Sequence, residues 1–143
     1  MKGLTIKWQR LVDENGRTCE RCGATEKEVE KALSTLQQAL APLGLEVTLE
    51  KGMIDVSTFI KDPLASNRIW IDNRPLEEWL GAQVGQSYCC SSPCLDEECR
   101  TITVEGQTYE TIPAELIIKA GLIAASRIAG LGPAGSCCGC TSR

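Results

Sequence analysis

The first third of the chain combines two patterns of apolar and polar positions. Residues 4–9 place Leu, Ile and Trp at every second position, the period of a β-strand with one buried face. Apolar residues then recur with helical spacing over 29–40, after the capping-box pattern Thr25-Glu26-Lys27-Glu28 and before the helix-stopping Pro42. Residues 45–50 alternate again. These patterns predict a strand, a helix of about 17 residues and a second strand parallel to the first.

The middle and end of the chain predict one more strand, a hairpin and a closing helix. The pattern of residues 68–72 predicts the third strand, and a short helical segment follows it at 76–80. Residues 101–104 and 107–111 flank a Glu-Gly turn, which is typical of a hairpin. Helical spacing then returns from residue 116 to residue 128, after a proline suited to a first helical turn.

Two segments show no periodicity. One is an insert at about residues 81–99, and the other is residues 131–143, which begin within the helix-stopping sequence Gly-Leu-Gly-Pro-Ala-Gly at 130–135. We therefore expect one α/β domain over residues 1–130, with a central mixed sheet flanked by helices, and a flexible tail over 131–143.

Composition narrows the function. The chain has 143 residues, enough for one domain with its own core, and a net charge of −4, which argues against nucleic acid and anionic membranes as partners. It has no uncharged apolar run of about 20 residues and no secretory signal, so we expect a cytoplasmic protein. It also has no histidine, which excludes His-dependent triads, His general bases and His-ligated metals. The nine cysteines are the remaining candidates for chemistry.

The first cysteines, Cys19 and Cys22, form a Cys-x-x-Cys pair between the first predicted strand and its helix. This spacing lets two thiols come within disulfide distance, and a helix N-terminus or a nearby cation stabilises a thiolate. Cys19 is therefore the candidate nucleophile and Cys22 the resolving thiol. Arg21 favours a thiolate and Glu20 opposes it. Because the capping box begins at Thr25, the helix is expected to start after Cys22; the alternatives are half of a zinc site or inert thiols.

The other seven cysteines are candidate ligands for zinc or another thiophilic metal ion. The spacing of the first four matches neither a ferredoxin nor a zinc ribbon, and a redox relay or a purely structural role is the alternative for them. For the last three, the alternative is a dispensable tail. In the tail, a mobile dithiol would have a high effective concentration near its own domain and could act as a shuttle. The two groups are Cys89, Cys90, Cys94 and Cys99, and then Cys137, Cys138 and Cys140.

The order of elements around the Cys-x-x-Cys pair resembles the thioredoxin-like fold. More closely, residues 3–130 resemble a poorly characterised thioredoxin-like family of bacteria and archaea. The segments that carry the resemblance are Trp8-Gln9-Arg10-Leu11, Thr18-Cys19-Glu20-Arg21-Cys22, Arg68-Ile69-Trp70-Ile71-Asp72-Asn73 and Ile112-Pro113-Ala114-Glu115-Leu116-Ile117.

The resemblance implies a fold more than an activity. It places Cys99 at the start of a strand, where it would lie nearer to the first pair than its sequence distance indicates. The chain departs from thioredoxins before the third strand, where Ser66-Asn67-Arg68 replaces the usual cis-proline. The tail element Ser136-Cys137-Cys138 is similar to the C-terminal vicinal thiols of mercuric reductases, which implies transfer of metal.

The leading hypothesis is thiol–disulfide exchange by Cys19 and Cys22, linked to arsenic or mercury handling, with a redox partner protein or a small thiol as electron donor. The alternative is a non-enzymatic protein that sequesters or delivers zinc, copper(I), arsenite or mercury. An iron–sulfur electron carrier is a third hypothesis.

Overall fold

The computed structural model describes residues 2–88 and 98–129. It contains a mixed four-stranded sheet in the order β2-β1-β3-β4. β1 pairs in parallel with β2, from Lys2 opposite Leu45 to Leu11 opposite Ile54, and antiparallel with β3. The strands are β1 (Lys2–Leu11), β2 (Leu45–Ile54), β3 (Arg68–Ile71) and β4 (Arg74–Pro75). The predicted strand–helix–strand unit with parallel strands and the third strand are confirmed.

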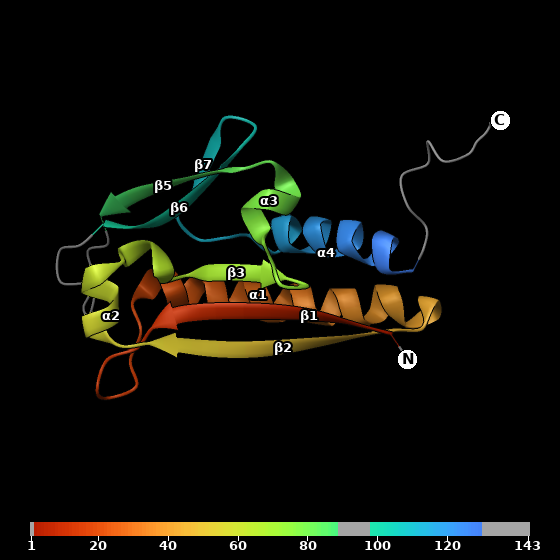
Figure 1. The fold of residues 1–143 in the computed structure, drawn as a ribbon, viewed down its shortest axis with the longest axis horizontal. Helices are drawn as coiled ribbons and strands as arrows, with labels where there is room; N and C mark the ends of the chain where they lie inside the picture. The colour runs from red at the N-terminus through yellow and green to blue at the C-terminus, as the bar shows by residue number, and fades with distance from the viewer. Residues whose placement is uncertain (1, 89–97, 130–143) are drawn as a thin grey trace.

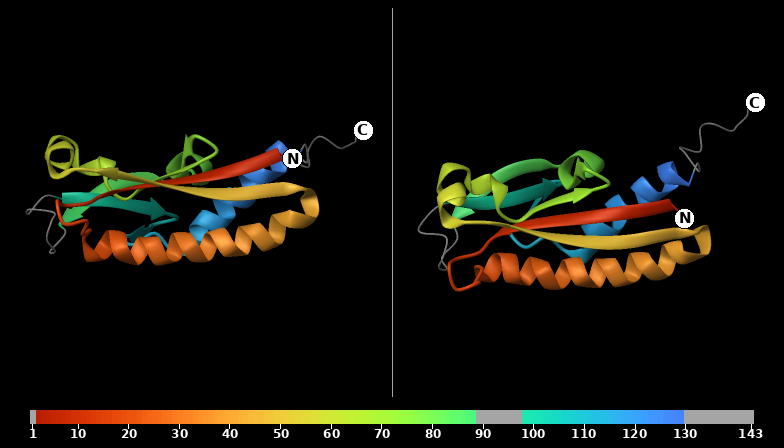
Figure 2. Two further views of the ribbon diagram at one scale, coloured as in Figure 1. Left: turned by 90° about the horizontal axis from the view of Figure 1, so that it is seen from below. Right: turned by 60° about the horizontal axis from the view of Figure 1, so that its bottom comes forward.

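Helices cover the apolar face of this sheet (Figure 1, Figure 2). α1 runs along β1 and β2, and α4 packs against α1. The helices are α1 (Glu20–Leu40), α2 (Val56–Lys61), α3 (Leu76–Leu80) and α4 (Ala114–Ile128), with 3-10 turns η1 (Ala41–Leu43) and η2 (Pro63–Ala65). Among the helices in the described part of the chain, none is both long enough and apolar enough to span a bilayer.

The core lies between the sheet and these two helices. Leu4, Ile6 and Trp8 alternate into it from β1, as the period-2 pattern predicts. Gly121 of α4 allows close packing against α1, because a Cβ atom there would lie 2.6 Å from Leu36 Cδ1.

A second, antiparallel sheet has the order β5-β6-β7. Its strands are β5 (Gln83–Tyr88), β6 (Glu98–Val104) and β7 (Gln107–Tyr109). The predicted hairpin around Glu105-Gly106 is confirmed as β6–β7. β5, however, occupies part of the segment that showed no periodicity, so the described part of the chain has two sheets where one central sheet was expected. The tail at residues 131–143 lies outside the described residues.

The start of α1 is also different from the prediction. The helix begins at Glu20 and has 21 residues, so the Thr25 capping-box interpretation is wrong. Thr25 Oγ1 instead accepts a hydrogen bond from the backbone N–H of Ile112 (3.2 Å), and Glu28 Oε1 accepts one from Ala114 (3.0 Å). Both side chains bind the segment that enters α4, and the earlier start brings the cysteine pair onto the helix terminus.

Candidate functional site

Cys19 occupies the N-cap position of α1. Its backbone is extended (φ −75°, ψ 165°), and its sulfur accepts a hydrogen bond from the backbone N–H of Cys22 at 3.4 Å. The first helical bond, from Gly23 N–H to the Cys19 carbonyl, is 2.9 Å long. A sulfur atom thus takes the place that a Ser, Thr or Asp oxygen usually has at a helix start. This position is at the positive end of the helix, where a negative charge is stabilised.

The turn before Cys19 is held by Asp13. Its carboxylate accepts hydrogen bonds from the backbone N–H groups of Arg17 and Asn15, both at 2.9 Å. These bonds, first the one from Arg17, hold the pKa of Asp13 below its usual value. The bonds close the turn between β1 and α1.

Cys22 lies one helical turn after Cys19 and is its hydrogen-bond partner. The hydrogen bond to the Cys19 side chain, followed by burial and the charge of Cys19, raises the pKa of Cys22 far above its ordinary value. Cys22 therefore keeps its proton and offers it to the Cys19 sulfur. Ser66 Oγ lies 3.4 Å from Cys22 Sγ, on its other side.

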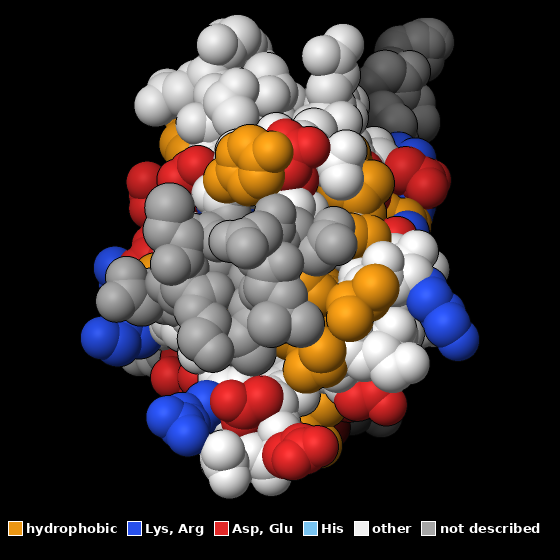
Figure 3. Space-filling view, turned by 90° about the vertical axis from the view of Figure 1, so that its left-hand side faces the viewer, with side chains coloured by type: hydrophobic (Ala, Val, Ile, Leu, Met, Phe, Trp, Pro, Cys, Tyr) orange, Lys and Arg blue, Asp and Glu red, His pale blue; other side chains and the backbone are white. Residues whose placement is uncertain are grey.

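Cys19 and Cys22 are both buried, and each has 1% of its surface exposed to solvent. The end of the molecule at which α1 begins carries exposed hydrophobic side chains among acidic ones (Figure 3). Exposed apolar residues of the elements at this end are Met53, Ile60 and Tyr88. A reagent reaches Cys19 only after the atoms packed over it move.

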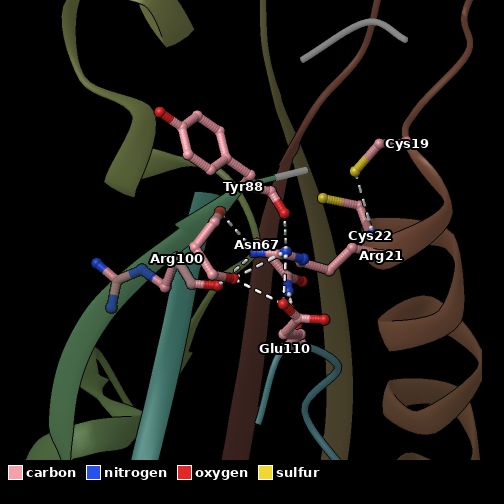
Figure 4. Close-up of polar contacts among 8 residues, drawn as sticks. Cys19, Arg21, Cys22, Asn67, Tyr88, Arg100 and Glu110 are labelled. Atoms are coloured by element: carbon pink, nitrogen blue, oxygen red, sulfur yellow. Dashed lines mark hydrogen bonds and ion pairs between the residues drawn. The ribbon is translucent and has the colours of Figure 1, made fainter. Parts of the chain in front are cut away.

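Arg21 does not point at the cysteines. It extends from the first turn of α1 toward Glu110, while the two sulfurs lie beside each other above it (Figure 4). Its guanidinium forms an ion pair with Glu110 Oε2 (3.2 Å) and donates to Ser87 Oγ (3.0 Å) and to the Tyr88 carbonyl (2.9 Å). These contacts join α1 to β5, and the effect of Arg21 on a Cys19 thiolate stays a prediction.

The segment before β3 is fixed from three sides. Asn67, with a left-handed backbone (φ +59°), accepts a hydrogen bond from Trp8 Nε1 at 3.1 Å. Gln9 Nε2 donates to the Ala65 carbonyl, and Arg100 Nε to the Leu64 carbonyl. Burial lowers the pKa of Arg100, and its ion pair with Glu77 (3.3 Å) opposes that shift. Ser66, at the centre of this segment, is thereby held against Cys22.

The structure brings together only some of the predicted cysteines. Cys99 lies on β6, buried, opposite Ser87 of β5. Across residues 2–88 and 98–129, no three Cys, Asp or Glu side chains are arranged to hold a metal ion, so Cys99 forms no such site with Cys19 and Cys22. The remaining predicted ligands lie outside the described residues: Cys89, Cys90, Cys94, Cys137, Cys138 and Cys140.

Comparison with known proteins places this chain in a family. Residues 4–121 match a domain of unknown function, DUF2703. The chain belongs to the DUF2703 family. An archaeal relative described as an uncharacterized protein, from Archaeoglobus fulgidus, is 46% identical over 114 residues, which is 80% of this chain and 82% of the relative. No solved structure matches this DUF2703 chain.

Sequence reasoning missed Ser66 as part of this site. The only signal was its place, just before the third strand, where thioredoxins have a residue that faces the cysteine pair. The DUF2703 match covers Cys19, Cys22 and Ser66 together.

Proposed function

We propose that this DUF2703 protein carries out thiol–disulfide exchange with Cys19 as nucleophile and Cys22 as resolving thiol. The observation that carries the proposal is the pairing at the helix start. The Cys19 sulfur accepts the Cys22 backbone N–H at the N-cap of α1, and the side chain of Cys22 supplies a second hydrogen bond to it. A thiolate at this position would be stabilised by backbone donors and by the helix dipole.

We further propose that the fold is thioredoxin-like. The sheet order β2-β1-β3-β4, with β3 antiparallel to β1, supports this assignment. So does the position of the cysteine pair at the junction of β1 and α1, next to the segment that leads into β3. In the thioredoxin-like arrangement, that junction is where substrate disulfides are attacked.

The reaction has two exchanges. The Cys19 thiolate attacks one sulfur of a substrate disulfide, a Cys19–sulfur bond forms, and the substrate S–S bond breaks with loss of one thiolate. The Cys22 thiolate then attacks the Cys19 sulfur, an intramolecular disulfide forms, and the second substrate thiolate leaves. The substrate gains two electrons and two protons, and the protein pair is oxidised. A redox partner protein or a small thiol reduces the pair again.

The burial of the cysteine pair limits which disulfides can react with Cys19. Because Cys19 is 1% exposed, a folded substrate has to displace the atoms over it before the first exchange. The exposed side chains of Met53, Ile60 and Tyr88 provide apolar area at the same end of the molecule, where a protein partner could bind. Slow exchange with large disulfides and faster exchange with small ones follows from this geometry.

The experiment measures how much the full chain accelerates the reduction of a small disulfide, glutathione disulfide, over the rate with dithiothreitol, the final reductant, alone. Cys19→Ser should abolish the turnover, and Cys22→Ser should trap a mixed disulfide on Cys19 that mass spectrometry detects. Cys99→Ser, also a buried cysteine, is the matched control. A second background, with Ser at 137, 138 and 140, removes any exchange by the C-terminal cysteines. Wild-type turnover by Cys19→Ser in that background would refute the proposal.

Mass spectrometry of the protein purified without reductant tests the metal-binding alternative. A mass lower by two protons, restored by mild reductant, supports the disulfide. A bound thiophilic ion that protects all nine cysteines would instead favour storage or delivery of metal.

A further inference from the structure

Ser66 is a buried hydroxyl in contact with the resolving cysteine. It is 1% exposed, and its Oγ lies 3.4 Å from Cys22 Sγ and 3.0 Å from the backbone nitrogen of Leu11. The Leu11 N–H donates to Ser66 Oγ, so that contact leaves the single hydroxyl proton of Ser66 unused. The Cys22 sulfur is in position to receive that proton in a hydrogen bond.

A continuous donor chain results. Ser66 donates to Cys22, and Cys22 donates its own thiol proton to Cys19. While Cys19 is a thiolate, this chain keeps Cys22 protonated. Once Cys19 is bonded to a substrate sulfur, its charge is gone and Cys22 has to become the thiolate. Ser66 is then the hydroxyl that faces the new charge.

From this geometry we infer that Ser66 is a positioning residue, whose hydroxyl donates to the Cys22 sulfur and stabilises it as the thiolate that attacks the mixed disulfide at Cys19. The inference rests on the proposed thiol–disulfide exchange and assigns its second step to a residue outside the Cys-x-x-Cys motif. In that step the Cys22–Cys19 S–S bond forms and the bond from Cys19 to the substrate sulfur breaks. Cys22 gives up its thiol proton to water before the attack, and the substrate leaves as a thiolate that takes up a proton from water.

Thr18 adds a second hydroxyl at the same place. Its Oγ1 is buried and has no hydrogen-bond partner within bonding geometry among the described residues. Ser66 and Thr18 both act to lower the pKa of Cys22, against the larger opposite effects of Cys19 and of burial. Cys19 is the titratable group with the largest effect on the pKa of Cys22, and the nearby Arg21 is paired with Glu110. An unpartnered buried hydroxyl is available to donate when Cys22 ionises.

The position of Ser66 is fixed by its neighbours rather than by Cys22. The Asn67 side chain is bound to Trp8, and the carbonyl of Ala65 is bound to Gln9. Ser66 therefore keeps its place when the bond to Cys22 changes, as a donor needs to do if it is to act in one step of the cycle.

The first test is residue-resolved titration of Cys22 in the full chain labelled with carbon-13 cysteine. Cys19→Ala is used as background, because it removes the Cys19 sulfur that accepts the Cys22 proton. Removal of the donor by Ser66→Ala should move the Cys22 titration midpoint up by about one pH unit, a tenfold loss of thiolate at a given pH. Ser66→Thr keeps the hydroxyl and should restore the midpoint. Ser57→Ala, an exposed serine of α2, is the matched control.

The second test is the rate of the resolving step. Cys19 is converted to a mixed disulfide with thionitrobenzoate, and loss of that adduct from the Cys19 peptide is followed after acid quenching. Below the titration midpoint of Cys22, Ser66→Ala has about tenfold less Cys22 thiolate, but that thiolate is more nucleophilic because its pKa is higher. The resolving step should therefore be about three- to fourfold slower. Formation of the adduct at Cys19 should be unchanged.

The outcomes separate the two proposals. An unchanged Cys22 midpoint and an unchanged resolving rate in folded Ser66→Ala would overturn the role of Ser66, even if Cys19→Ser abolishes exchange. If Cys19 proves not to exchange at all, the proposed function fails, and the Cys22 titration still decides whether Ser66 donates. Should Ser66→Ala not fold, Ser66→Gly is used in both tests, since it leaves room for a water molecule at the Leu11 N–H.

Discussion

Removal of the Arg21 side chain is expected to destabilise the domain without changing the chemistry of the cysteines. The side chain is 7% exposed and has its strongest contacts to Ser87, Tyr88 and Glu110, which lie far from it in the sequence. Arg21→Ala leaves the Tyr88 carbonyl without this donor and removes the cation that faces Glu110. The junction between α1 and the second sheet loses most of its polar contacts.

The magnitude follows from the geometry. Hydrogen bonds to a charged group contribute about 1.5–3 kcal/mol to the unfolding free energy, and Arg21→Ala removes the donors to Ser87 and Tyr88. Glu110 has 59% of its side chain exposed and can be hydrated when it is left alone, so the expected cost of Arg21→Ala is about 3 kcal/mol. In a domain of this size, each kcal/mol lowers the melting temperature by about 2–4 °C, so a fall of roughly 6–12 °C is expected. Glu110→Gln keeps an acceptor for Arg21 and should cost about 1 kcal/mol or less.

Urea and thermal unfolding of the full chain measure this effect, with Arg17→Ala as matched control. The Arg17 side chain is exposed, and its Nε lies 3.9 Å from Asp13 Oδ2. Removal of this side chain should therefore change the unfolding free energy by less than about 0.5 kcal/mol. If Arg21→Ala is no less stable than Arg17→Ala, the contacts of the Arg21 side chain do not contribute to the unfolding free energy, and the prediction is wrong. It also fails if Arg21→Ala keeps full stability but lowers the reactivity of Cys19, since Arg21 would then act on the sulfur.

Three further predictions concern packing, pH and access. Gly121→Ala should cost about 1–3 kcal/mol in urea unfolding, because the new Cβ meets Leu36 Cδ1 at 2.6 Å; an unchanged stability would show that the helices separate freely. The hydrogen bond from Ala114 holds the pKa of Glu28 below its usual 4.5. The stability that Glu28 contributes is therefore complete above that pH and is lost as the pH falls through the lower folded value, so Glu28→Gln should flatten acid unfolding curves. Finally, Cys19 should react with N-ethylmaleimide faster than with a polymer-linked maleimide in the native state, with a much smaller difference in urea; equal native rates would contradict its burial.

The elements that bury a regular apolar face were predictable from the sequence. β1, β2 and α4 alternate or repeat at the expected period because one side of each contacts the core. β5 was not predictable, because its half-buried positions, Gly85 and Ser87, carry no apolar side chain and so leave no apolar alternation in the sequence. α2 was also missed: it has six residues and buries only Phe59.

Only those residues of the candidate site that lie close together in the sequence were predictable. Cys19 and Cys22 are three residues apart, so their spacing and position before a helix are visible in the sequence. Ser66 and Glu110 come from distant segments, and nothing within four residues of either marks it as a partner of α1. The misplaced helix start has the same origin, since Thr25 and Glu28 have the pattern of a local cap but bind the segment that enters α4.

These non-local contacts also bear on the function. Under the proposed function, the Cys19 thiolate is stabilised at the start of its own helix, within a few residues of the cysteine itself. Under the role inferred for Ser66, Cys22 depends on a hydroxyl from the segment before β3, and that segment is held by Trp8 and Gln9 of β1. Changes in the sheet should therefore leave the attack of Cys19 on the substrate unchanged and slow the attack of Cys22 on the mixed disulfide. Local disruption of the Trp8–Asn67 contact is expected to accumulate the mixed disulfide at Cys19, because attack can still occur while resolution is slowed.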